Sequence, residues 1–282
     1  MNLNKHKFWD LRKPNYLAYL LLPLTILIKI NIFISNLYFK KKFDKIKTIC
    51  IGNIYLGGTG KTPATLKLYQ LLKDNNYNVV NAKKFYPNQQ DEYLLLKNKS
   101  QIISLKNRKE IIEHAIEKNY ELIIFDDGLQ DKAIDYNLKF VCFDSQNFIG
   151  NGFLIPAGPL REKINSLKKY DGVILKILDK NKDLSEIISR IKSINPKIEI
   201  FNTYVKIKNI DMFKRSDQYL FFSGIGNSTS FKEILIKNDF NIVEEKIFTD
   251  HYRYKDKDFK EILEIAKKKN LKIIKKKKDY IK

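Results

Sequence analysis

The fold of this chain is decided by the stretch Gly52-Asn53-Ile54-Tyr55-Leu56-Gly57-Gly58-Thr59-Gly60-Lys61-Thr62-Pro63. An apolar run, residues 46–51, precedes it and predicts a buried strand, and residues 63–72 follow with the spacing of a helix. A glycine-rich turn between a strand and a helix lets backbone N–H groups converge on phosphate oxygens at the positive end of the helix dipole. The stretch therefore predicts a phosphate-binding loop.

The end of the stretch predicts specific nucleotide and metal contacts. Lys61 is expected to reach the β- and γ-phosphates, and Thr62 is expected to hold Mg²⁺. The expected nucleotide-binding residues are Gly57, Gly58, Thr59, Gly60, Lys61 and Thr62. The general pattern G-x-x-x-x-G-K-[ST] requires a glycine at position 55, where this chain has Tyr55. The loop is therefore a variant of the general form.

Strands and helices alternate after the loop. Apolar strand-like runs occupy residues 77–82, 120–125, 138–143 and 173–177, with helical segments at 93–97, 111–118 and 184–194. This order predicts an α/β fold with a P-loop type parallel sheet flanked by helices, and places functional residues at the carboxyl ends of the strands. A strand at 219–222 and a helix from Ser230 start the pattern again, so we expect a second, smaller α/β lobe.

The expected organisation has four parts. Residues 1–45 form an N-terminal helical segment, 46–197 the P-loop lobe, 198–212 connecting strands and 213–282 the C-terminal α/β lobe. Between residues 16 and 39 the only charged residue is Lys29, and basic residues flank the segment. A spanning helix needs ~20 apolar residues. Because Pro23 and three polar residues interrupt this run, we expect a helix lying on the cytoplasmic face of a membrane. A buried core helix or hairpin is the alternative.

Composition indicates an anionic partner. The 282 residues carry a formal net charge of +21, from 53 Lys+Arg against 32 Asp+Glu. Nucleic acid, an acidic membrane or a phosphorylated substrate would fit this excess. Lysine, asparagine and isoleucine are abundant throughout, so part of the excess reflects a general compositional bias. A nucleic-acid-binding module would need a compact basic and aromatic stripe, which this sequence lacks, so we expect no nucleic-acid partner. Cys50 and Cys142 lie in apolar runs without metal-ligand spacing, which fits buried thiols in a reducing compartment.

Several acidic and basic residues are candidates for chemistry. Asp126-Asp127 directly follows an apolar strand, where a Walker-B-like Mg²⁺ site would lie, although the same letters also make common turns. Asp91-Glu92 could be solvated acids favoured by a helix dipole. His251 is one of three histidines, and a lone histidine is more often structural than catalytic. Arg161 could clamp a phosphate or lie on the surface.

Together these motifs resemble the tetraacyldisaccharide 4′-kinases, the lipid A 4′-kinases of Gram-negative bacteria. The resemblance spans most of the chain, in the family's order. Its motifs are the N-terminal apolar segment, the Gly52–Pro63 loop, Asp91-Glu92, Asp126-Asp127-Gly128-Leu129-Gln130, Pro156-Ala157-Gly158-Pro159-Leu160-Arg161-Glu162, Gly224-Ile225-Gly226-Asn227 and Asp250-His251-Tyr252. The resemblance implies transfer of the ATP γ-phosphate to the 4′-hydroxyl of a disaccharide lipid carrying a 1-phosphate, at the cytoplasmic face of the inner membrane.

The resemblance also implies roles for particular residues. Asp91 would be the general base, aided by His251, and Lys61 would be catalytic. Asp126 and Asp127 would serve Mg²⁺ together with Thr62, and Glu92 and Arg161 would contact the substrate. The implied cofactors are ATP and Mg²⁺, and the implied partners are the lipid disaccharide and the inner-membrane surface. We expect a monomer.

The sequence departs from the family pattern in two places. Residues 82–85 read Ala-Lys-Lys-Phe where the family has Ser-Arg-Gly-Tyr, and only Lys278-Asp279 remains of a Thr-Glu-Lys-Asp string. The competing interpretation is a membrane-associated P-loop switch ATPase, whose loop reads Lys-Gly-Gly-x-Gly-Lys-Thr. Leu56 occupies its signature lysine position, which counts against that class.

Overall fold

The computed structural model describes residues 6–87, 90–207, 209–224, 228–248, 252 and 254–275. It divides into two compact units. The first, here called the cradle unit, comprises Lys5–Pro87 and Leu96–Tyr204. The second, the C-terminal unit, comprises Met1–Asn4, Asn88–Leu95 and Val205–Lys282. Each unit is described separately below.

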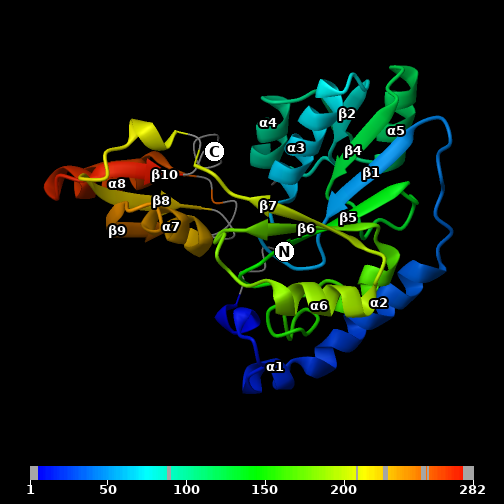
Figure 1. The fold of residues 1–282 in the computed structure, drawn as a ribbon, viewed down its shortest axis with the longest axis horizontal. Helices are drawn as coiled ribbons and strands as arrows, with labels where there is room; N and C mark the ends of the chain where they lie inside the picture. The colour runs from blue at the N-terminus through cyan, green and yellow to red at the C-terminus, as the bar shows by residue number, and fades with distance from the viewer. Residues whose placement is uncertain are drawn as a thin grey trace. The chain divides into compact units, whose positions relative to one another are not determined.

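A seven-stranded parallel sheet forms the centre of the cradle unit, with strand order β3-β2-β4-β1-β5-β6-β7 (Figure 1). The strands are β1 (Lys47–Gly52), β2 (Val79–Ala82), β3 (Ile102–Ile103), β4 (Leu122–Asp126), β5 (Leu138–Asp144), β6 (Gly172–Ile177) and β7 (Glu199–Tyr204). The central strands are short, nearly continuous apolar runs because both faces of the sheet are covered. This confirms the predicted P-loop type architecture. Of the predicted connecting segment, residues 198–212, the first part supplies the edge strand β7.

Helices cover both faces of this sheet. Since successive strand residues point to opposite faces, Ile49 and Ile51 pack with Tyr69 of α3 (Lys61–Asp74) on one side. Cys50, between them, belongs to the core on the other side, which includes residues of α5 (Arg108–Glu117) and α6 (Ser185–Ile194). A short 3₁₀ helix, η3 (Ile164–Lys169), precedes β6. The sheet is thereby buried between helical layers, with the carboxyl ends of its strands left to form a site.

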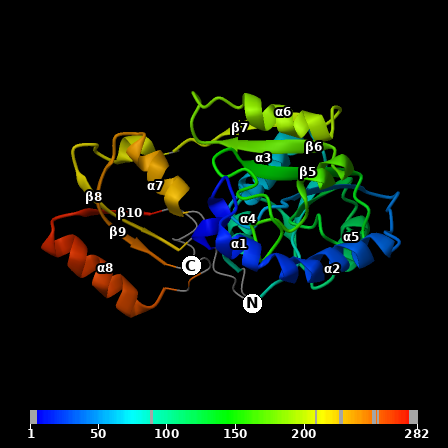
Figure 2. The ribbon, with the colours of Figure 1, turned by 90° about the horizontal axis from the view of Figure 1, so that it is seen from below.

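The N-terminal segment is a chain of short helices along the outside of the cradle unit, drawn in dark blue (Figures 1 and 2). These are η1 (Lys7–Asp10), α1 (Tyr16–Leu20), η2 (Leu22–Leu24) and α2 (Thr25–Leu37). The predicted break at Pro23 falls inside η2. The segment packs against the rest of the unit through three buried residues, Trp9, Ala18 and Thr25. Many of their large apolar side chains are nevertheless exposed, unlike those of a core hairpin. No helix in the described part of the chain is long and apolar enough to cross a bilayer.

The C-terminal unit is a second, smaller α/β lobe, as predicted. Its parallel sheet has the order β10-β8-β9, from β8 (Gln218–Ser223), β9 (Asn241–Ile247) and β10 (Lys272–Lys275). Its helical elements are α7 (Ser228–Ile236), α8 (Asp256–Lys268) and η4 (Ile210–Met212), and the unit also takes in most of α4 (Gln90–Lys97). Tyr219 and Phe221 face one apolar cluster while Leu220 and Phe222 face another. The sequence reading did not predict β9, α8 and β10.

Candidate active site

The phosphate-binding loop connects β1 to α3 in a conformation that requires glycine. Gly60 caps the helix with a left-handed φ of +89°, and Gly57 has a φ of +147°. A Cβ on Gly60 would lie 3.3 Å from Cδ of Lys176 as well. The helix starts at Lys61, so its first N–H groups, which have no partner inside the helix, point out of the loop end. This is the anion-binding arrangement predicted from the sequence.

Tyr55 belongs to a short extended pairing rather than to the glycine turn. It forms an antiparallel bridge with Leu160. Backbone bonds flank the bridge: Leu56 N donates to Pro159 O at 2.8 Å, and Arg161 N donates to Ile54 O at 2.7 Å. The Tyr55 ring is 2% exposed, packs with Leu160, and its hydroxyl donates to a carboxylate of η1. The glycine turn therefore begins at Gly57, downstream of this pairing, which explains why position 55 tolerates a large side chain.

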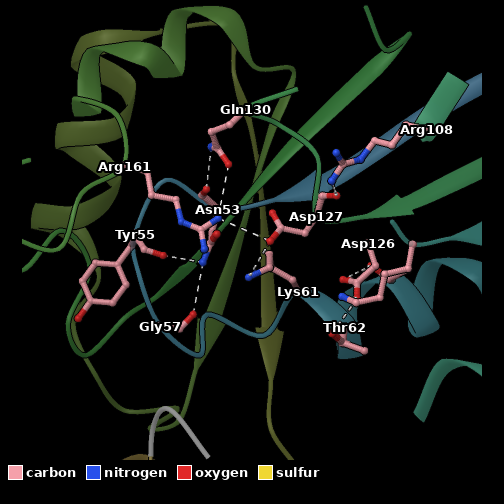
Figure 3. A network of polar contacts seen from close by, with 12 residues as sticks. Asn53, Tyr55, Gly57, Lys61, Thr62, Arg108, Asp126, Asp127, Gln130 and Arg161 are labelled. Carbon is pink, nitrogen blue, oxygen red and sulfur yellow. Dashed lines mark hydrogen bonds and ion pairs between the residues drawn. The ribbon is translucent and has the colours of Figure 1, made fainter. Parts of the chain in front are cut away.

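Two buried polar atoms in the loop lack protein partners. Among the described residues, Thr59 Oγ1 and Asn53 Oδ1 have no hydrogen-bond partner. The other end of the Asn53 amide is used, because Nδ2 donates to the carbonyls of Tyr55 and Gly57 at 2.5 and 3.3 Å (Figure 3). Buried polar groups are almost always hydrogen-bonded. A hydroxyl without a partner in a glycine cradle fits a loop whose ligand is a nucleotide phosphate.

Asp126 lies beside the loop because its strand pairs with β1. The register places Asp126 opposite Ile51, one residue before the loop begins. Its Oδ2 accepts a hydrogen bond from Thr62 Oγ1 at 3.0 Å and forms an ion pair with Lys83 Nζ, also at 3.0 Å. Its Oδ1 accepts a longer bond from Thr65 Oγ1 at 3.4 Å. The carboxylate is 1% exposed, so these donors compensate the burial of its charge.

Asp127 brings two cations together. Its Oδ2 lies 3.9 Å from Lys61 Nζ and 3.5 Å from Arg161 Nη1 (Figure 3). Its φ of +70° is unusual for a residue with a side chain, and Arg108 supports the turn. Arg108 Nη2 donates to the Asp127 carbonyl at 2.7 Å, and Nη1 pairs with Asp131 at 2.9 Å. These contacts hold the Asp127 carboxylate at the mouth of the loop, beside two cations.

Hydrogen bonds join two of the sequence motifs, residues 126–130 and residues 156–162, into one side of the site, here called the wall. Gln130 Nε2 donates to Asn53 O at 3.0 Å (Figure 3). The same Nε2 donates to Glu162 Oε1 at 2.8 Å. The Tyr170 hydroxyl donates to both oxygens of Glu162, at 3.1 and 3.2 Å. Burial, and then the charge of Glu162, raise the pKa of Tyr170, so its hydroxyl stays protonated as a donor. The Asp-Asp-Gly-Leu-Gln and Pro-Ala-Gly-Pro-Leu-Arg-Glu strings are therefore joined by direct contacts.

Lys176, at the end of β6, holds the loop from its other side. Its Nζ donates to the Gly58 carbonyl at 3.1 Å and pairs with Asp144 at 2.5 Å. Its aliphatic stem lies against Gly60. Asp144 is 2% exposed at the end of β5. The cradle is thus fixed by a side chain from a strand two places away from β1 in the sheet.

The structure brings together five of the predicted site residues in the cradle unit: Lys61, Thr62, Asp126, Asp127 and Arg161. Asp91 and Glu92 lie in the first turns of α4, in the stretch that groups with the C-terminal unit. His251 lies outside the described residues. The roles of these three residues remain predictions.

Four residues that contact the loop or its acidic neighbours were missed as candidates: Lys83, Arg108, Gln130 and Lys176. Lys83 and Lys176 lie at the carboxyl ends of parallel strands, so the rule that located Asp126 could also have found them. Within the described chain there is no cluster of three or more His, Cys, Asp or Glu residues placed for a metal. The oxygens able to contribute to a metal site beside a nucleotide are those of Thr62, Asp126 and Asp127.

Comparisons with known sequences show one family. The sequence profile of the family described as tetraacyldisaccharide-1-P 4′-kinase matches residues 17–282. The tetraacyldisaccharide 4′-kinase of Pelagibacter ubique is 47% identical over 283 residues, covering 100% of this chain and 88% of the relative. That of Rickettsia akari is 34% identical over 294 residues, covering 98% of this chain and 87% of the relative.

A solved structure shares the fold. The crystal structure of LpxK from Aquifex aeolicus in complex with ATP superposes with a TM-score of 0.66 at 22% identity. The match covers 94% of this chain and 90% of that one.

Proposed function

The chain belongs to the tetraacyldisaccharide-1-P 4′-kinase family, and we propose that the site described above performs that family's reaction. The protein is an ATP-dependent phosphotransferase of lipid A biosynthesis that acts on the 4′-hydroxyl of a tetraacyldisaccharide. The observation that carries the proposal is the loop itself. A glycine cradle with an unpartnered buried hydroxyl, Thr59 Oγ1, opens beside Lys61 and the adjacent carboxylates Asp126 and Asp127.

The cradle unit supplies the phosphate-binding half of the chemistry. The first N–H groups of α3 and the Thr59 hydroxyl would bind phosphate oxygens, and Lys61 and Arg161 would supply positive charge as the γ-phosphoryl group moves. Both cations already lie within 3.9 Å of one carboxylate oxygen of Asp127. Lys61, Arg161 and Asp127 together carry one net positive charge, which favours a phosphate at this point.

The oxygen atoms of Thr62, Asp126 and Asp127 fit a site for Mg²⁺. Thr62 offers a hydroxyl oxygen 3.0 Å from the Asp126 carboxylate, and Asp127 offers a second carboxylate. Mg²⁺ in kinases prefers one or two carboxylates together with phosphate oxygens and water. Thr62, Asp126 and Asp127 would hold the ion, which when bound neutralises charge on the phosphates.

Proton removal is assigned to Asp91. A sugar hydroxyl is a poor acid, so a carboxylate within hydrogen-bond reach can take its proton as the oxygen bonds to the γ-phosphorus. The bond from that phosphorus to the bridging oxygen breaks, and ADP leaves. We assign His251 as the residue that orients Asp91, and Glu92 and Arg161 as substrate contacts, on the motif positions that they share with the family.

A phosphorylation assay tests this proposal. Incubation with Mg-ATP and tetraacyldisaccharide 1-phosphate should give a product heavier by one phosphate. The variant Asp91→Ala should lose most of the rate while its ATP affinity stays within about twofold of wild type, because the cradle belongs to other residues. ATP hydrolysis stimulated by vesicles, with no phosphorylated lipid formed, would instead support the switch ATPase class.

We further propose that α1 and α2 dock the protein on the cytoplasmic face of the inner membrane. A group of large apolar side chains on these helices and on η2 between them is at least 50% exposed: Tyr16, Tyr19, Leu20, Leu24, Ile26, Leu27, Ile30, Phe33 and Leu37. So many exposed large apolar side chains within 22 residues of sequence indicate an interaction surface. Basic residues flank the segment, which suits anionic headgroups.

Substitution tests this docking better than deletion. Removing residues 1–42 would also remove buried Trp9 and Thr25 and so disturb folding. The double variant Leu27→Ser/Phe33→Ser changes only exposed side chains and should reduce pelleting with phospholipid vesicles several-fold. Met212→Ser, an equally exposed apolar position in the other unit, is the matched control. Unchanged pelleting of the double variant would contradict the proposal. The expected monomer is tested by light scattering.

A further inference from the structure

A pocket of about 320 Å³ lies between α2 and the loop that leads out of the active site. Its lining comes from two parts of the cradle unit: Leu22, Thr25 and Lys29 on the helical side, and residues 152–154 and 163–165 on the loop side. The lining residue Phe153 is held by an edge-on contact with Tyr19 of α1, with ring centroids 5.7 Å apart. The volume is in the range of small-molecule sites.

Three of the four polar side chains that line this pocket have no partner among the described residues, whereas the fourth, Thr25, donates to the Leu22 carbonyl at 2.7 Å. Lys29, Lys163 and Asn165 line it, and within the described chain none of their side chains forms a hydrogen bond or ion pair. No acidic residue is among the lining residues. Elsewhere in the unit lysines do find carboxylates, as Lys139 does with Asp135 at 3.1 Å. Two unneutralised ammonium groups and an amide facing an otherwise mostly apolar pocket favour an anion.

Helix geometry places Lys29 at the edge of the exposed apolar face. At 100° per residue, Ile26, Ile30 and Phe33 share the exposed side of α2, whereas Ile28 and Ile32 pack against the cluster around Tyr55. Lys29 falls between these two directions. When the exposed side contacts a bilayer, a lysine at this boundary lies at headgroup depth, with its stem along apolar surface.

The loop that lines the pocket also contributes a residue to the phosphate site. Lys163 follows Arg161 by two residues, so their Cα atoms are at most about 7 Å apart. Arg161 contacts the Asp127 carboxylate at the phosphate site. Glu162, between them, is buried in the wall with Gln130. One short segment therefore contributes a cation to the phosphate site and a second cation to the pocket under α2.

We propose that this pocket binds the 1-phosphate of the lipid substrate, with Lys29 and Lys163 as its cations and Asn165 as a neutral donor. The inference rests on the proposed function, because the acceptor then carries its reacting hydroxyl on one sugar and its phosphate on the other. Two lysines on separate elements, one of them two residues from Arg161, suit a phosphate of fixed position on the substrate better than they suit bulk phospholipid. The role is binding, so the pocket sets acceptor affinity rather than the rate of phosphoryl transfer.

The test compares two acceptors in nonionic detergent micelles without phospholipid. One is tetraacyldisaccharide 1-phosphate and the other is the same lipid lacking the 1-phosphate. For Lys29→Met and Lys163→Met, KM for the phosphorylated acceptor should rise about tenfold each, with kcat within twofold of wild type. KM for the acceptor without phosphate should stay at the wild-type value. The paired Lys→Arg variants should keep the wild-type preference, because they keep the charge.

A lysine outside the pocket provides the matched control. Lys168 is exposed on η3, has no described partner and does not line the pocket, so Lys168→Met should behave as wild type. Equal losses on both acceptors, or no loss on either, would overturn the proposal. Weaker pelleting of the pocket variants with acidic phospholipid vesicles, without a change in acceptor preference, would assign the pocket to bulk lipid and overturn it too.

Binding without ATP separates this proposal from the proposed function. Equilibrium binding of the two acceptors should show that wild type prefers the 1-phosphate form about tenfold or more and that Lys29→Met/Lys163→Met has no preference. If wild type shows this binding preference but does not phosphorylate the acceptor, the proposed kinase function is contradicted and the proposed phosphate pocket is supported. If wild type binds both acceptors equally, the proposed phosphate pocket is contradicted and the proposed kinase function is unaffected.

Discussion

Replacing Lys83 by methionine should destabilise the cradle unit far more than the same change at a neighbouring lysine. The Lys83 side chain is 4% exposed, and its Nζ lies 3.0 Å from Oδ2 of Asp126, whose side chain is fully buried. Methionine keeps most of the stem but removes the charge, so the carboxylate stays buried without its cation. Breaking a buried pair in this way costs about 3–5 kcal/mol. The hydroxyls of Thr62 and Thr65 still donate to Asp126, so we expect about 3 kcal/mol, the lower end of that range.

The assay can follow this unit alone. Trp9 is the chain's single tryptophan and is fully buried in the cradle unit, so its fluorescence reports unfolding there even if the two units unfold separately. In guanidinium the free energy of unfolding of Lys83→Met should fall by about 3 kcal/mol, and the melting temperature by roughly 6–12 °C. Lys84→Met is the control. Among the described residues its Nζ has one contact, over the Tyr86 ring at 5.6 Å, so its loss should cost at most about 1 kcal/mol.

A double-mutant cycle shows whether the ion pair is the cause. Asp126→Asn alone leaves Lys83 buried without its counter-charge, and the double variant Lys83→Met/Asp126→Asn leaves neither charge. The double variant should therefore lose at least about 1.5 kcal/mol less than the sum of the two single variants. Additive losses, or a Lys83→Met protein as stable as Lys84→Met, would refute the reasoning that this buried pair supports the loop.

Three further predictions concern the loop and the thiols. Lys176→Ala should weaken ATP binding about tenfold by calorimetry, because Lys176 holds a loop carbonyl at 3.1 Å, whereas Lys180→Ala should leave it unchanged. Tyr55→Gly, which restores the general loop pattern, should cost about 3–5 kcal/mol of stability in denaturant unfolding without improving ATP affinity. Burial raises the pKa of Cys142 from an ordinary 9.0 to about 12 and that of Cys50 well above its ordinary value, so neither thiol should react with a thiol reagent at pH 8 until the protein unfolds. Because both pKa values are raised, their contribution to stability is complete below pH 9 and should be lost as pH rises toward 12.

Much of the cradle unit could be predicted because its signals are local. The apolar run before Gly52 and the helical spacing after Lys61 each depend on a few consecutive residues, and parallel pairing then brings Asp126 to the loop. The same rule would place Lys83 at the carboxyl end of its strand, but it could not predict that the side chain is buried. A lysine after a short strand reads as solvent-exposed, and its burial depends on a carboxylate 43 residues later in the chain. The sequence contained both residues without indicating that they pair.

The C-terminal unit was predicted less completely for a different reason. In β9 (Asn241–Ile247) partly buried residues alternate with exposed ones, none is fully buried, and three of the seven residues are charged. Such a strand has a weak apolar signal because it lies at the edge of a three-stranded sheet. In α8 the buried positions Ile262 and Ala266 stand among many lysines and acids. The abundance of lysine in this chain therefore hides amphipathic elements that a less charged sequence would reveal.

Tyr55 shows why a departure from a motif can be more informative than the motif. The general phosphate loop needs glycine only where the backbone must approach phosphate, and here that begins at Gly57. Upstream, residues 54–56 pair with 159–161, so Tyr55 is a core residue of the contact between two loops. The partner loop continues through Arg161 at the phosphate site to Lys163 at the pocket under α2. These backbone bonds couple the position of the nucleotide cradle to the segment proposed to hold the lipid, and the Tyr55 side chain adds packing against Leu160 that a glycine would lack.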